Sequence, residues 1–454
     1  MSARTATSAL KGASARGFAS TSAARLPPKP NSPAARAAQM AKQRKQATNA
    51  DEEGAAVTGT GNVLSEVTLP RPDLSGLKVL HPESVTKRAV GQVLAFPDRA
   101  LESFKALSIP GSIQREHAFT PRPAAVVRGA TVKAVETLEQ AKEKGSSKGS
   151  RFVLAGGSGS GKSTLLLQAV SYAQSTDWVV LYLPSATPLV NSSTPHLYSS
   201  SRALFDQPLL SSSLLSKFTA ANKAAFKALK TSKEHTFGLG ENVKKVAKGK
   251  SLEDLAKAHG GDEKTVTAVF ETVMEELSTQ TERPVLLALD SCQSLFSTTS
   301  YLTPSYHPVE AFELVVPRLL LDYVSGARTF GKGAVLLAKS GVAREQSAAL
   351  NDFLAASEAE KGSEGKKKVL ESAYDRQTVS SYSTYLSILQ STGVQTLPVE
   401  PRLSRQEAVG VVEMLKGFRA TREAVDDKMF LERLVTTDGN PREFARVLRE
   451  SLAV

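Results

Sequence analysis

The chain has 454 residues, 41% of them hydrophobic, which is enough for two or three domains with a sizeable core. No uninterrupted apolar run is long enough to cross a bilayer, so the sequence does not predict a helical membrane protein. The single cysteine, Cys292, excludes an intrachain disulfide and a cysteine-based zinc cluster, which fits a reducing interior compartment. We interpret Cys292 as a small buried apolar residue.

The formal net charge of +12 is unevenly distributed along the chain. The first fifty residues contain nine lysines or arginines and no acid, so the other 404 residues carry a net charge of only +3. A nearly neutral body does not by itself argue for extensive nucleic-acid binding. We therefore expect RNA contacts to be confined to the basic N-terminal arm and to a basic insertion.

The N-terminus has the composition of a mitochondrial import sequence, because residues 1–22 are rich in Ser, Thr and Ala, contain spaced arginines and lack acids. The stretch 16–20 resembles a matrix-protease site, and cleavage after Phe18 predicts a targeting sequence of residues 1–18. A disordered basic tail is the alternative interpretation. Residues 19–75 then form an extended, disordered basic arm that can order on an anionic or protein surface.

Four short apolar runs predict core strands of a parallel sheet, at residues 152–155, 178–183, 285–289 and 334–338. They alternate with helical patterns, which predicts an α/β domain. We expect three parts after the arm: an N-terminal segment with a helix at 132–144 (76–145), the α/β domain (146–400) and a helical C-terminal lid domain (401–454).

An insertion is predicted at about residues 190–260, because about a hundred residues between the second and third strands exceed a simple crossover. Its serine-rich start, 192–213, predicts a loop, and the periodicity at 214–229 and 251–277 predicts helices. The basic stretch 230–250 predicts a surface segment. Its lysines either form a solvated face or contact an RNA or an acidic partner.

Two further segments carry local signals. Residues 358–368 are low in complexity and predict a mobile loop. From residue 403 onward the pattern is helical, with capping-box spacing between Ser404 and Glu407. Asn440 followed by Pro441 predicts the start of another helix.

Residues 156–163 read Gly-Gly-Ser-Gly-Ser-Gly-Lys-Ser, a complete match to a phosphate-binding loop. Glycines let the backbone N–H groups surround a phosphate, Lys162 reaches the β- and γ-oxygens, and the Ser163 hydroxyl ligates Mg²⁺. A Gly/Ser linker is the alternative, but a predicted strand before the loop and a helix after it favour the motif. The candidate nucleotide-binding residues are Gly156, Gly157, Ser158, Gly159, Ser160, Gly161, Lys162, Ser163 and Thr164.

Asp290 ends the third predicted strand, where phosphate-loop proteins place an acid that holds the Mg²⁺ shell. We expect Ser163 and Asp290 to be the metal ligands; an aspartate that caps the turn is the alternative. Ser291 then stands where active AAA+ ATPases usually have a glutamate, so we do not expect efficient hydrolysis, and no catalytic residue is assigned. Gln293 is either a water-orienting residue or a structural or solvated glutamine.

Two more residues are candidates for nucleotide contact. Ser340 follows the fourth predicted strand, where related ATPases have a polar residue that senses the γ-phosphate. Arg442 lies near the start of a C-terminal helix, where an arginine of the lid often reaches the nucleotide. A strand-end polar group and an exposed helix residue are the respective alternatives.

Four stretches together are similar to the death-associated protein three family: residues 177–186, 204–209 (Leu-Phe-Asp-Gln-Pro-Leu), 287–290 and 439–441. The resemblance spans roughly residues 110–450. Phe-Asp-Gln-Pro is its most specific part, because no general nucleotide chemistry demands it. The resemblance implies an AAA+-like P-loop NTPase fold with a five-stranded parallel sheet and a helical C-terminal lid. It also implies bound GTP or GDP with Mg²⁺; no Ras-type Asn-Lys-x-Asp segment is visible, so ATP stays open.

The function that the resemblance implies is a structural component in the head of the mitochondrial small ribosomal subunit. The protein would bind a purine nucleotide with little or no turnover in the matrix and support translation or subunit assembly. The implied partners are small-subunit ribosomal proteins and rRNA, with a large-subunit contact at the head and no membrane. The alternative is an active AAA+-like matrix ATPase or GTPase, for which neither a glutamate after Asp290 nor an arginine finger can be identified.

Overall fold

The computed structural model describes residues 76–118, 120–238, 243–341, 346–359, 379–391, 393–420 and 426–450. All of them belong to one compact unit, Arg71–Val454. The predicted import sequence (1–18), the basic arm (19–75) and residues 360–368 of the predicted loop lie outside the described residues.

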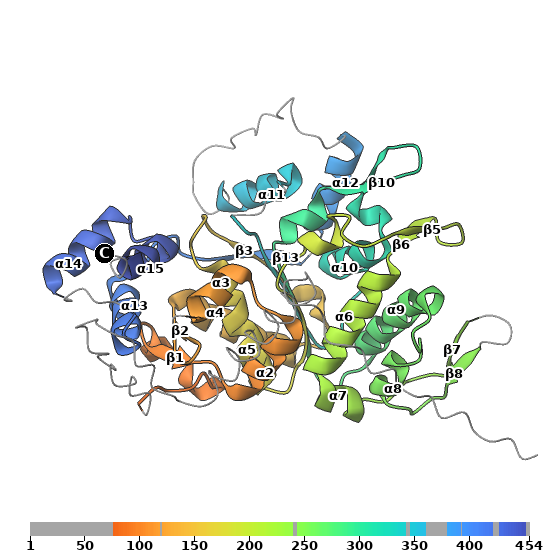
Figure 1. Cartoon of the computed structure of the whole chain (residues 1–454), viewed down its shortest axis with the longest axis horizontal. Coiled ribbons are helices and arrows are strands. Elements are labelled where there is room, and N and C mark those ends of the chain that lie inside the picture. Colours follow the sequence, from red (N-terminus) through yellow and green to blue (C-terminus); the bar gives the residue numbers. More distant parts are fainter. Residues whose placement is uncertain are drawn as a thin grey trace, which may run out of the picture. The chain divides into compact units, whose positions relative to one another are not determined.

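Five parallel strands form the central sheet, in the spatial order β13-β3-β12-β9-β4 (Figure 1). Their bounds are β3 Arg151–Ala155, β4 Val179–Leu183, β9 Val285–Asp290, β12 Gly333–Ala338 and β13 Val394–Pro398. Every residue of β3, β4, β9 and β12 is buried, as expected for parallel strands that are covered on both faces. The α/β class and the four strands predicted from the sequence are confirmed.

The strand register brings the carboxyl ends of the three central strands together. Ala338 of β12 pairs with Leu154 of β3 on one side and with Asp290 of β9 on the other. The segments that follow β3, β9 and β12 therefore start at one edge of the sheet, where ligand sites of open α/β sheets lie.

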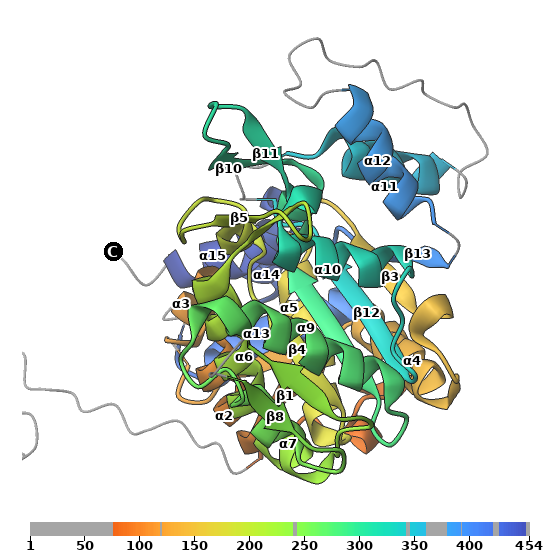
Figure 2. The same cartoon turned by 90° about the vertical axis from the view of Figure 1, so that its right-hand side faces the viewer.

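Fourteen helices are assigned within the described residues. They are α2 Asp98–Leu107, α3 Gly111–His117, α4 Gly129–Glu143, α5 Lys162–Ser175, α6 Pro208–Ala221, α7 Lys223–Ala228, α8 Leu252–Ala256, α9 Glu263–Thr279, α10 Val315–Ser325, α11 Ala348–Ala359, α12 Val379–Leu389, α13 Arg405–Gly417, α14 Asp427–Thr436 and α15 Pro441–Glu450. Helix α5 contacts β4, β9 and β12 on one face of the sheet. Figure 2 shows α9 and α10 on the opposite face.

Four antiparallel strand pairs surround the sheet: β1 Val93–Ala95 with β2 Ala124–Val126, β5 Leu197–Ser199 with β6 Leu204–Asp206, β7 His235–Phe237 with β8 Lys244–Val246, and β10 Thr298–Leu302 with β11 Pro308–Glu310. The loop predicted at 192–213 is therefore wrong in part, since it holds β5, β6 and the first turns of α6. Proline at the first helical position and the buried Leu210 start α6 despite the serines around them.

The C-terminal helices share a second apolar core with the first strand pair. Phe418 and Phe444 belong to one buried cluster with Ala95 and Val126. The capping box predicted for Ser404 and Glu407 is present at the start of α13. The helical residues after 403 are thus packed onto the segment that precedes the α/β sheet.

Candidate nucleotide-binding site

The glycine-rich loop connects β3 to α5, so the strand–loop–helix context of the motif is present. Gly159 and Gly161 have φ angles of 76° and 86°, a left-handed conformation that glycine adopts without steric cost. Helix α5 begins at Lys162. Its free N-terminal N–H groups and its dipole favour an anion in front of the loop.

Lys162 lies across its own loop. Its ammonium group donates to the carbonyl oxygens of Gly156, at 2.8 Å, and Gly157, at 2.6 Å. The side chain is buried, and burial together with the charge of Lys339 lowers the pKa of Lys162 from 10.5 to about 8, against the opposing effect of Asp290. An additional negative charge in front of the loop would therefore stabilise the charged form of Lys162.

Asp290 is buried at the end of β9, next to the start of α5. The Ser163 side chain and the Ser291 N–H, at 2.7 Å, are its hydrogen-bond partners. Burial raises the pKa of Asp290, and these hydrogen bonds and the charge of Lys162 oppose the rise. Ser163 and Asp290, both predicted metal ligands, thus meet at one point.

Gln293 is fully buried and pairs with the backbone of Ser340. Its amide NH₂ donates to the Ser340 carbonyl at 3.0 Å, and its amide oxygen accepts from the Ser340 N–H at 3.1 Å. This two-fold bond fixes the segment after β9 to the segment after β12. Of the two interpretations of Gln293, the structure therefore shows the structural one.

A polar pocket brings most of the predicted site residues together. Its lining includes Ser158, Gly159, Ser160, Gly161, Lys162, Ser163, Thr164, Lys339, Ser340 and Arg442. Gly156 and Gly157 lie behind it as acceptors for Lys162, and Asp290 lies behind Ser163. Lys162, Lys339 and Arg442 give this pocket a positive lining. Glu116, at the end of α3, is the carboxylate in its lining within the described part of the chain.

The first turn of α15 is bonded directly to the loop. The Asn440 side chain donates to the Ser158 carbonyl at 2.9 Å, and the Arg442 N–H donates to the Gly159 carbonyl at 3.2 Å. The Asn440 amide occupies the space that a Cβ at Gly159 would need, 2.4 Å away. Asn440, predicted only as a helix cap, thus also fixes the C-terminal helices to the loop.

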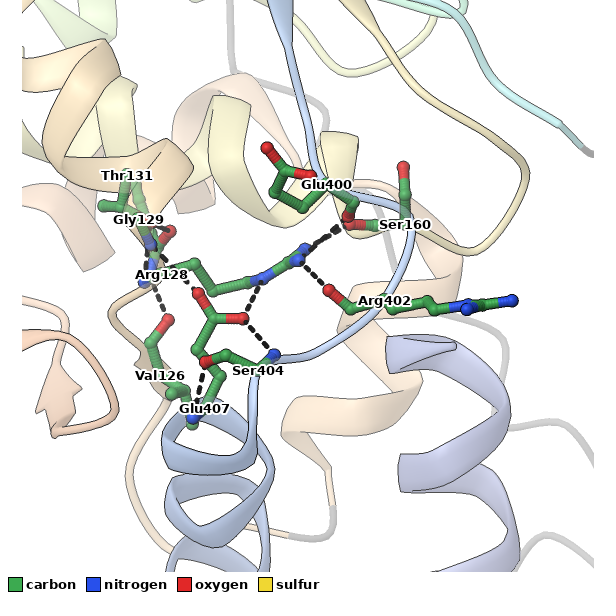
Figure 3. A network of polar contacts seen from close by, with 10 residues as sticks. Val126, Arg128, Gly129, Thr131, Ser160, Glu400, Arg402, Ser404 and Glu407 are labelled. Carbon is green, nitrogen blue, oxygen red and sulfur yellow. Dashed lines mark hydrogen bonds and ion pairs between the residues drawn. The ribbon is translucent and has the colours of Figure 1, made fainter. Parts of the chain in front are cut away.

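Arg128 makes a second connection between the loop and the C-terminal helices (Figure 3). Its guanidinium donates to the carbonyl oxygens of Ser160, Glu400 and Arg402, and forms an ion pair with Glu407 at 3.3 Å. Glu407 also accepts from the N–H groups of Gly129 and Ser404. Sequence reasoning missed Arg128, because no motif marks an isolated arginine in front of a helix.

An apolar pocket adjoins the polar one and was also missed. It lies between β2 and α5 on one side and the C-terminal helices on the other, and its lining includes Val126, Leu165, Leu403 and Met414. Gly161 and Thr164 line both pockets. Its walls come from segments about three hundred residues apart, so no local pattern could have predicted it.

Within the described residues, no three His, Cys, Asp or Glu side chains are grouped so as to hold a metal ion. A Mg²⁺ ion at Ser163 and Asp290 would therefore need phosphate oxygens and water as further ligands. None of the described helices is both long and apolar enough to span a membrane.

The fold and the site define an α/β protein with a glycine-rich loop between a central strand and its helix, closed by C-terminal helices. A family model described as "Mitochondrial ribosomal death-associated protein 3" matches residues 125–447, and the chain belongs to this family, which confirms the resemblance. The small ribosomal subunit protein mS29 of Neurospora crassa is 29% identical over 388 residues, 82% of this chain and 76% of that protein. The protein of the same name from Schizosaccharomyces pombe is 26% identical over 367 residues, 80% and 72% of the two chains.

Proposed function

We propose that this protein is a structural component of the mitochondrial small ribosomal subunit that holds a purine nucleotide with little or no turnover. The observation that carries the ribosomal part is family membership over residues 125–447, together with relatives named as small ribosomal subunit proteins that align with most of the chain. The observation that carries the nucleotide part is the polar pocket in front of the glycine-rich loop.

In this proposal the phosphates bind the loop N–H groups, Lys162, Ser340 and Arg442. The oxygens of Ser163 and Asp290 are the ligand type that Mg²⁺ prefers; Ser163 lines the pocket, and Asp290 lies behind it as its hydrogen-bond partner. A bound Mg²⁺ would neutralise phosphate charge. The adjoining apolar pocket is suited to a flat purine ring, since ligand pockets combine apolar walls with a few polar groups. GTP, GDP and ATP all satisfy these requirements.

Slow nucleotide hydrolysis is expected because no residue near Asp290 is placed to orient the attacking water in the described part of the chain. Ser291 occupies the position after it, and Gln293 has both ends of its amide bonded to Ser340, so its side chain is not available to orient a water. Hydrolysis needs a group that positions the attacking water. The proposal therefore treats the nucleotide as a stabilising ligand and the AAA+-like fold as a scaffold.

The proposed location is the matrix, in the head of the small subunit, with small-subunit proteins and rRNA as neighbours and a contact with the large subunit. The description of the family model supports the mitochondrial ribosome as the destination, and the names of the relatives support its small subunit. The finer placement rests on the family resemblance alone.

Sedimentation of mitochondrial extract on a sucrose gradient tests the proposal. The full-length protein is expected to migrate with the small ribosomal subunit and to show slow triphosphate turnover when purified. A free protein that hydrolyses triphosphate rapidly would instead support the alternative of an active matrix ATPase or GTPase.

A further inference from the structure

The net charge of the body is concentrated in one short segment. Residues 76–454 carry a formal net charge of +7, and residues 217–257 supply +6 of it, from ten lysines and four acids. The remainder of these residues is thus close to neutral. This segment comprises the end of α6, together with α7, α8 and the β7–β8 hairpin, which lie together in Figure 1.

Six of these lysines form what we term the lysine surface: Lys223, Lys227, Lys230, Lys245, Lys248 and Lys250. All six are exposed, and none has a carboxylate within ion-pair distance among the described residues. Two ion pairs lie nearby: Lys257 with Glu253 at 2.6 Å, and Lys233 with Glu275 at 2.7 Å. The exposed Asp254 carboxylate accepts a hydrogen bond from the Ser251 hydroxyl.

Three lysines of the lysine surface lie around the first turn of α8. A hydrogen bond from Lys257 lowers the pKa of Glu253, and the charges of Lys227 and Lys223 add to this effect. Lys230 pairs with Ser251 in an antiparallel bridge, and the N–H of Thr231 bonds the carbonyl of Lys250. Lys223, Lys227 and Lys250 thus lie near the carboxylates of Glu253 and Asp254, and backbone bonds hold the segments after α7 and β8 side by side.

The elements that carry the lysine surface are packed against the main hydrophobic core. Phe226, Phe237, Val246 and Leu255 are all buried beneath it in the main core. The β7–β8 hairpin is also held by a buried hydrogen bond between His235 and Glu276 on α9, at 2.6 Å. The backbone of this surface is therefore already ordered, so binding a partner needs to order only the lysine side chains.

The composition of this surface favours a nucleic acid over a protein partner. Protein interfaces have aromatic or aliphatic anchors at their centre and are depleted in lysine. Of the exposed large apolar side chains in the described residues, only Val243, at 39%, belongs to the segment 217–257. Lysine without apolar anchors suits the phosphate backbone of RNA, which needs positive charge rather than a hydrophobic pocket.

We propose that the lysine surface, which lies on α7, on β8 and on the turns that follow them, binds the phosphate backbone of RNA, without reading its sequence. The inference rests on the proposed function, since it names rRNA as the partner of one defined surface. Phosphate contacts of this kind make the affinity strongly dependent on salt concentration.

Binding of the full-length protein to a labelled RNA hairpin, measured over a range of salt concentrations, tests the surface. The variant replaces Lys223, Lys227, Lys248 and Lys250 with Gln; the control replaces Lys133, Lys142, Lys144 and Lys148, all exposed on α4 and the turn after it. The first variant is expected to lose at least about tenfold in affinity at low salt. The slope of log affinity against log salt concentration should become less negative by about 3, because each lost phosphate contact reduces the slope by about 0.7–0.9.

Both variants carry the same net charge, so only a localised surface separates them. Equal losses in the two variants, or no loss in either, would overturn the proposal. Thermal unfolding of both proteins checks that the substitutions of exposed side chains leave the fold intact.

RNA–protein crosslinking in purified small subunits separates failure of this inference from failure of the proposed function. Crosslinks from rRNA to peptides of residues 217–257 support the inference. A protein that sediments with the small subunit but crosslinks through this segment only to an acidic protein overturns the RNA assignment and leaves the ribosomal function standing. Absence of the protein from the small subunit overturns the ribosomal function, and with it the assignment of rRNA as the partner of the lysine surface.

Discussion

Lys162 is both part of the loop's hydrogen bonding and the cation proposed to bind phosphate. Its ammonium group donates to the carbonyls of Gly156 and Gly157, so the side chain already lies across the glycine-rich loop. Burial and Lys339 make the charged form costly. A phosphate would compensate this positive charge, which is why the lysine is expected to contribute mainly when nucleotide is present.

Replacing Lys162 with Ala should remove most of the stabilisation that nucleotide gives. A ligand bound only to the folded state adds about 4 kcal/mol to the free energy of unfolding at roughly 1,000 times its Kd. Thermal unfolding with and without added GTP or ATP measures this gain, with Lys148→Ala as the exposed control. A Lys162→Ala protein that gains as much as the wild type would show that the loop does not bind phosphate.

Nucleotide affinity should fall as the pH rises above about 8. The free protein loses the Lys162 proton near pH 8, whereas a bound phosphate keeps the lysine charged, so binding above this pH requires proton uptake. The affinity should fall by up to about tenfold per pH unit until the pKa of the complex is reached. Calorimetric titrations between pH 7 and 9.5 check this, and a flat profile would contradict it. Lys162→Arg, which stays charged, should bind without this pH dependence.

The residue motifs were predictable where their chemistry is local in sequence. Residues 156–164 and Asp290 follow directly from spacing and from the strand that precedes each of them. Arg128 and the partners of Asn440 could not be predicted, because their contacts join segments that are hundreds of residues apart. The role of Gln207 in the Phe-Asp-Gln-Pro segment was not predicted either: it is buried and donates to the Leu189 carbonyl and the Tyr301 hydroxyl, both at 3.0 Å.

The C-terminal helices depend on a small number of polar connections to the α/β domain. Arg128 and Glu407 are both largely buried, with side-chain exposures of 12% and 7%. Glu407 completes the capping box of α13 and holds the Gly129 N–H at the start of α4. One carboxylate thus joins two helix N-termini to the loop-bound arginine.

Glu407→Ala should therefore destabilise the protein much more than the loss of a helix cap alone. Breaking a buried ion pair typically costs about 3–5 kcal/mol, whereas loss of a capping side chain costs about 1 kcal/mol. Ser404→Ala removes only the cap and is the matched control. Chemical denaturation of both variants gives the comparison. Equal destabilisation would show that the Arg128–Glu407 pair does not stabilise this interface.

Elements were predictable where one physical signal dominates. The four central strands are continuous apolar runs, because both of their faces are covered. Strand β13 is at the sheet edge and only Leu397 among its residues is buried, so it gave no such run. The start of α6 was missed because serine favours loops, while the buried leucines and Pro208 determine the helix.

At the scale of the whole molecule, the nucleotide would connect parts that are distant in sequence. The polar pocket is lined by the glycine-rich loop, by residues after β12 and by the start of α15. A ligand there would hold the C-terminal helices against the sheet as a cofactor that is not consumed. The lysine surface lies elsewhere, on α7, on β8 and on the turns that follow them, so the proposed nucleotide and RNA contacts can be tested independently.

The nucleotide content of small subunits purified through a tag on this protein tests the central claim most directly. Denaturing the gradient-purified subunits and measuring the released nucleotide by mass spectrometry should give about one purine nucleotide per copy of the wild-type chain. Subunits that contain the Lys162→Ala chain should give much less. A wild-type chain that sediments with the subunit but releases no nucleotide would contradict the account.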